Sequence, residues 1–184
     1  KDYLSNLDPF KRYFYASDIK EFEAYENQLD DQIRAYDVSF FNLTNERLLQ
    51  RIGESKKIYA EILEKPFDFS QNEEYSADYK KLDYVNSKRE MKERWRQQHK
   101  FSTIVNYDDS VTQRDLNLES NELPKSIFSP EKEKSKSKEK KSMKKIESEA
   151  REVTKRSLDE LYDYIEDRRR KDWFAVYINA IVEE

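Results

Sequence analysis

Glycine and proline are scarce in this chain of 184 residues, which contains only Gly53 and four prolines. Glycine supplies the positive φ angles that tight β-hairpins and phosphate-cradling loops require. The composition therefore disfavours an all-β fold and a glycine-rich phosphate-binding architecture, and it predicts an all-α fold. The length fits one domain or two small helical layers.

Cysteine is absent, and histidine occurs once, at His99. The lack of cysteine excludes disulfides and thiolate metal sites, and it is compatible with either a cytosolic or an exported protein. One histidine leaves no His-rich metal site and no base for Ser/His or Cys/His chemistry, so we interpret His99 as a surface or packing residue. The pairs Asp30/Asp31 and Asp108/Asp109 lack the spacing of a calcium loop, and we predict neither a metal nor a cofactor.

Long hydrophobic runs are also missing. No apolar run approaches 18 residues and the first residue is Lys1 rather than Met, so we expect neither an intact signal peptide nor a membrane span. We interpret the chain as an excised piece of a protein. The formal net charge of −4 argues against a general nucleic-acid binder.

Charge and aromatic residues are both abundant. Charged residues make up 40% of the chain, which is typical of disorder, yet 13 Tyr, 10 Phe and 2 Trp carry more aromatic surface than disordered chains usually do. Strongly amphipathic helices reconcile the two observations.

The first two predicted helices form an antiparallel hairpin. Ser17 or Asp18 is expected to cap the first, with Glu21 as capping-box partner. Ser39 is expected to cap the second, which ends near residue 64, before Pro66. Apolar residues follow helical spacing in both: Ile19, Phe22, Leu29, Ile33 and Tyr36 in the first, and Phe41, Leu48, Ile52, Tyr59 and Ile62, together with Ser55, in the second.

The entry to the hairpin is aromatic, and its exit has no clear period. We expect Leu7, Phe10, Tyr13, Phe14 and Tyr15 to pack beneath the first helix. Residues 65–86 are expected to run over the surface, anchored by Phe67 and Phe69.

Ser87 and Glu90 form an S-x-x-E capping box that begins a third helix, through about residue 100. Its predicted apolar side comprises Met91, Trp95, Phe101, Ile104 and Val105. The N-terminal helical part of the chain is thus expected over residues 1–105.

Residues 106–145 are expected to form a long low-complexity loop. Its end is rich in lysine, with eight Lys against two Glu over residues 132–145 and no interleaved aromatic residues for base stacking. We interpret this tract as a solvated loop, with binding to nucleic acid or an anionic surface as the alternative.

Residues 146–184 return to helix. One helix is predicted along Ile146, Ala150, Val153, Ser157, Leu161 and Ile165, and a last helix from Asp172. The apolar face of the last helix comprises Trp173, Phe174, Tyr177, Ile178 and Ile181.

Three blocks carry a family resemblance: residues 7–33 (LDPFKRYFYASDIKEFEAYENQLDDQI), residues 65–75 with the Trp95 helix, and residues 158–182 (LDELYDYIEDRRRKDWFAVYINAIV). Together they resemble the opening of the bacterial tail-specific, or carboxy-terminal processing, proteases. Residues 106–145 depart from the family pattern, which is usually a continuous helical stretch there.

The resemblance implies a helical N-terminal domain that precedes a PDZ module and a Ser/Lys peptidase module, and we expect the chain to stop before both. It implies a periplasmic or cell-envelope location, an adaptor as partner, and protein substrates recognised by their C-termini. No catalytic residue is assigned, because a Ser/Lys dyad needs a tight turn, an oxyanion hole and a desolvated lysine.

The last apolar face lies where the missing modules would attach, which makes it the candidate interdomain interface: Trp173, Phe174, Tyr177, Ile178 and Ile181. The main alternative function is a free-standing helical adaptor or scaffold.

Overall fold

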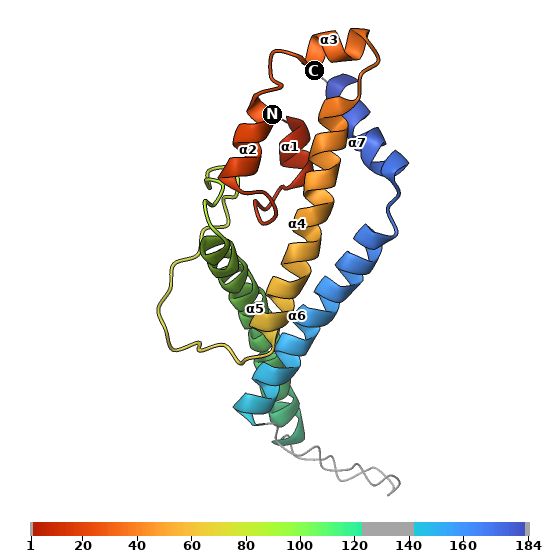
Figure 1. Ribbon diagram of the computed structural model, residues 1–184. Coiled ribbons are helices and arrows are strands. Elements are labelled where there is room, and N and C mark those ends of the chain that lie inside the picture. The colour runs from red at the N-terminus through yellow and green to blue at the C-terminus, as the bar shows by residue number, and fades with distance from the viewer. Residues whose placement is uncertain (1, 123–141, 183–184) are drawn as a thin grey trace, which may run out of the picture.

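The computed structural model describes residues 2–122 and 142–182, and these residues form seven α-helices (Figure 1). The predicted all-α fold is confirmed. The helices are α1 (Asp2–Leu7), α2 (Ala16–Glu23), α3 (Leu29–Arg34), α4 (Ser39–Leu63), α5 (Lys88–Glu122), α6 (Met143–Glu166) and α7 (Arg170–Val182).

The three long helices α4, α5 and α6 converge toward one end of the molecule, while the shorter helices gather around the other end of α4 (Figure 1). Helices α5 and α6 run antiparallel, because Thr103 faces Thr154 and Arg114 reaches Met143. The predicted stripe of α4 is buried throughout its length. The largest fully buried side chains include Trp95 and Tyr162, so the core lies where α4, α5 and α6 meet the segment before α2.

The helical hairpin is present, because Asp18 pairs with Arg51 and Phe22 packs against Phe40 across α2 and α4. The prediction of one continuous first helix is wrong, since α2 ends at Glu23 and α3 begins only at Leu29. Phe22 is fixed in the core, and residues 26–28 offer nothing apolar to bury, so the chain turns there. Ile33 and Tyr36, predicted as core, are exposed.

The predicted caps of both hairpin helices are also wrong. Tyr15 is the N-cap of α2, and its N–H donates to Asp18 Oδ2 at 2.9 Å. The Asp18 carboxylate is buried beside Arg51, whose Nη2 donates to Oδ1 at 2.8 Å. This pairing explains why Asp18 lies inside the helix rather than at its cap. At α4, Asp37 Oδ1 accepts the N–H of Ser39 at 2.9 Å, so Asp37 supplies the oxygen expected from Ser39.

The loop predicted over residues 106–145 is wrong for residues 106–122, which continue α5. The inner face of α5 here is polar but satisfied: Thr103 bonds Thr154 at 3.0 Å, and Asn106 donates to Thr154 Oγ1 at 3.1 Å. Paired hydroxyls and amides hold the helices together without an apolar period. The lysine-rich tract up to residue 141 lies outside the described residues, and α6 begins at Met143.

In α5 and α6, the buried side of the helix differs in part from the predicted apolar side. In α5, Met91 and Trp95 are buried, but Phe101, Ile104 and Val105 are exposed. In α6, Val153 and Ser157 face solvent, and the buried line is Ile146, Glu147, Ala150, Thr154, Leu158, Tyr162 and Ile165. The predicted α5 capping box is confirmed in part, because Ser87 Oγ accepts the N–H of Glu90 at 3.3 Å.

The surface segment between α4 and α5 has the predicted anchors. Phe67 packs against the core, and the ring of Phe69 lies 5.2 Å from that of Tyr107. Tyr75 stacks on Phe101 at 4.9 Å, so the segment covers part of α5's outer side.

Tyr36 holds a left-handed backbone conformation, with φ of 54°, at the end of α3. Its side chain is 93% exposed, and the N–H of Asp37 donates to the Gln32 carbonyl at 2.8 Å, as in a helix C-cap that favours glycine. We expect Tyr36→Gly to raise the free energy of unfolding by about 0.5–1 kcal/mol and Tm by roughly 1–4 °C. Tyr36→Ala is the matched control, because it removes the ring but keeps the Cβ strain; an equal gain from both variants in thermal denaturation would contradict this explanation.

Candidate interdomain surface

Helix α7 begins at an N-terminal cap. Asp172 Oδ2 accepts the N–H of Arg169 at 2.8 Å, so α7 starts at Arg170, two residues before the predicted Asp172. The acidic side chain in the first turn also complements the helix dipole. Ahead of the helix, the guanidinium of Arg168 lies 4.8 Å from the Trp173 ring centroid.

Helix α7 lies antiparallel to the first turns of α4. Arg170 Nη2 donates to Asn42 Oδ1 at 2.6 Å, and one turn later the rings of Phe174 and Phe41 meet at 5.0 Å. Figure 1 shows α7 ascending beside the upper half of α4. This path brings the end of α7 to the same end of the molecule as α3.

The five predicted interface residues lie on different sides of α7. Trp173 and Tyr177 are buried inside this chain, while Phe174 and Ile181 are half-buried at its edge. Ile178 is 38% exposed. Sequence reasoning missed Val182, which is 78% exposed; its position one turn after Ile178 was the available signal.

The inner side of α7 is anchored by an aromatic cluster. The Tyr177 ring lies 5.1 Å from Tyr3 and 5.7 Å from Phe41, and Tyr3 Oη lies 2.9 Å from Thr44 Oγ1. Burial raises the pKa of Tyr177, and it raises that of Tyr3 to about 12. Both phenols are neutral at physiological pH, and their rings hold the inner side of α7 by packing. Ile178 and Val182 face outward from the same helix.

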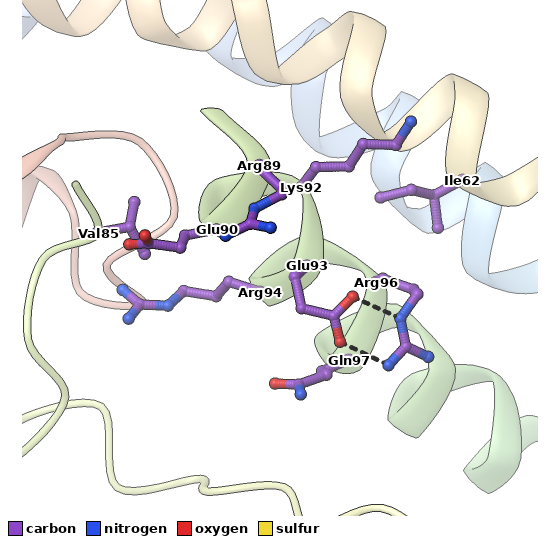
Figure 2. A pocket seen from close by; sticks show the side chains of 9 residues that line it. All are labelled: Ile62, Val85, Arg89, Glu90, Lys92, Glu93, Arg94, Arg96 and Gln97. Atoms are coloured by element: carbon purple, nitrogen blue, oxygen red, sulfur yellow. Dashed lines mark hydrogen bonds and ion pairs between the residues drawn. The ribbon is translucent and has the colours of Figure 1, made fainter. Parts of the chain in front are cut away.

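An open groove of about 650 Å³ lies between α4 and the first turns of α5 (Figure 2). Two of its cations pair with carboxylates: Lys92 with Glu61, and Arg96 with Glu93. At its edge, hydrogen bonds from Arg96 and Lys100 lower the pKa of Glu73 to about 2. The Nη atoms of Arg94 bind the carbonyl oxygens of Lys11 and Asp83. These contacts join α5 to α4 through Lys92, and to the surface segment through Arg94, Arg96 and Lys100.

The sequence matches the family model of the tail-specific protease N-terminal domain over residues 1–184. The chain belongs to this family. The match includes residues 106–145, where the sequence had departed from the expected family pattern, and within this range α5 continues as a helix through Glu122.

Among the described residues of this tail-specific protease N-terminal domain, the buried Ser55 and Lys100 both have polar partners. Ser55 Oγ donates to the Ile52 carbonyl and contacts the Tyr162 hydroxyl, while Lys100 pairs with Glu73. Within residues 2–122 and 142–182, no three His, Asp or Glu side chains are grouped to hold a metal ion. None of the helices in those ranges combines the length and apolarity that crossing a membrane requires.

Proposed function

We propose that this domain is the non-catalytic N-terminal part of a serine endopeptidase of the cell envelope that degrades or processes proteins recognised by their C-termini. Its role is to frame and position the PDZ and Ser/Lys peptidase modules of the same chain, and to present a surface to an adaptor. The observation that carries the proposal is the family match over residues 1–184.

The geometry of α7 supports this role. Its inner side is fixed by Trp173 and Tyr177, while Ile178 and Val182 form an outward apolar face on a rigid element. Apolar side chains held outward on a packed helix are suited to docking against another module. In this proposal Phe174 and Ile181 complete the contact from the edge of the helix.

The native protein provides the test. An antibody raised against this domain should capture, from the envelope fraction of its own cells, a polypeptide well above the 22.4 kDa of this chain. Mass spectrometry of that polypeptide should find a PDZ-like segment followed by a glycine-flanked serine and a later lysine. A native product of about 22.4 kDa would instead support the free-standing adaptor.

A further inference from the structure

The segment before α2 is attached to α5 by a set of polar contacts that we call the clasp. Consecutive carbonyl oxygens of residues 10, 11 and 12 accept hydrogen bonds from α5 side chains: from Gln98 at 3.3 Å, Arg94 at 2.8 Å and the indole N–H of Trp95 at 2.8 Å, respectively. The clasp therefore joins the aromatic entry of the chain to the longest helix.

Asp8 fixes the same segment from its other side. Its carboxylate accepts the N–H groups of Arg12, Tyr13 and Phe14, each at 2.9 Å, and the side chain is almost fully buried. The position of residues 8–14 thus depends on buried polar contacts, which weaken when water or an unpaired charge enters.

His99 lies beneath the clasp without a polar partner. It is 4% exposed, its ring lies 4.9 Å from Trp95, and neither ring nitrogen has a hydrogen-bond partner among the described residues. The Arg12 guanidinium stacks over the same Trp95 ring at 5.1 Å. A protonated imidazole would therefore lie near a second cation, in a buried position that offers it no polar partner.

Among the described residues, the rings and the cation that pack on the Trp95 ring include no carboxylate. The segment before α2 contributes Arg12 and Tyr13, and α4 contributes Tyr59, whose ring stacks on Trp95. From α6, Tyr162 packs on Tyr59. Burial, together with the nearby charge of Arg12, lowers the pKa of His99 to about 3.

We propose that His99 and the clasp form an acid-sensitive latch, in which protonation of the imidazole releases residues 8–14 from α5. With the clasp open, water solvates both His99 and Arg12. The latch is independent of the proposed enzymatic role of the parent protein, since it rests on contacts within this domain.

Proton linkage determines how the stability of the closed clasp changes with pH. The open state binds a proton on His99 near the ordinary pKa of 6.5 and the closed state only near 3, so closure is fully favoured above pH 6.5 and weakens as pH falls toward 3. The closed-to-open ratio falls tenfold per pH unit in this window, or about 30-fold between pH 7.5 and 5. Burial raises the pKa of Asp8, which contributes with the opposite sign.

Hydrogen exchange on the 184-residue chain tests the latch. The reporter is the indole N–H of Trp95, which donates to the Arg12 carbonyl across the clasp. After correction for intrinsic rates, its protection should fall between pH 7.5 and 5, and the fall should be about 30-fold larger in the wild type than in His99→Phe, which retains Asp8. His99→Gln is the second variant, in case the larger ring disturbs packing. The amide of Leu48, within α4, serves as the internal reference.

His99 is the only histidine, so its ring resonances report its titration directly. An imidazole that stays neutral at pH 5 while the clasp is closed supports the latch. A folded chain whose imidazole titrates near 6.5 would overturn it, as would equal losses of protection in the wild type and both variants.

Discussion

Trp95→Ala is expected to lower the free energy of unfolding by about 3–5 kcal/mol, which corresponds to a fall in Tm of roughly 6–20 °C. Trp95 is fully buried, and its ring contacts those of Tyr13, Tyr59 and His99. Truncation leaves a cavity at the junction of α4, α5 and the entry segment. It also leaves the Arg12 carbonyl without its indole donor.

Chemical denaturation of two matched variants checks this expectation. Trp95→Phe keeps much of the ring volume but loses the indole N–H, so its effect should lie between those of the wild type and Trp95→Ala. Tyr164→Ala removes an exposed aromatic ring and should change stability by less than about 0.5 kcal/mol. A loss below about 1 kcal/mol for Trp95→Ala would show that the core does not depend on this junction.

The sequence predicts α4 well because most of its buried residues are apolar and recur at helical spacing from Phe41 to Ile62. It fails for the continuation of α5, where Thr103 and Asn106 face Thr154. Small polar residues that satisfy each other across two helices look, in one sequence, like those of a solvated loop. Only the partner helix distinguishes the two cases.

The interdomain role of the α7 face stays a prediction, and the sequence anticipated only part of its geometry. Its helix and aromatic content followed from the sequence, but the division between inner Trp173 and outer Ile178 did not. Periodicity shows which side chains share a face of α7. The way α7 packs on α4 and α1 decides which of these faces is buried. The clasp was not predictable, because carbonyl acceptors carry no side-chain signature in the sequence.

Ile178→Asp should impair the complete enzyme while leaving this domain folded. The side chain is 38% exposed here, so the substitution creates no cavity in the core. If the outer face of α7 packs against the downstream modules, the new carboxylate becomes a buried unpaired charge at that contact, which costs several kcal/mol. We expect at least a roughly tenfold loss in kcat/KM on a tailed protein substrate.

Asn179→Asp is the matched control, because it adds the same charge at the next exposed position of α7. Both variants should unfold at nearly the wild-type temperature, since neither side chain belongs to the core. A shared loss of activity would attribute the effect to charge on the helix rather than to the apolar face.

The proposed positioning of the catalytic modules through α7 can be measured as kcat/KM of the proposed full-length endopeptidase on two substrates. The substrates are a folded protein with an apolar C-terminal tail and a short peptide that needs no positioning. We expect Ile178→Asp to lose turnover of the tailed protein but to keep that of the peptide, and we expect Asn179→Asp to match the wild type on both. Wild-type kcat/KM of Ile178→Asp on the tailed protein would contradict it.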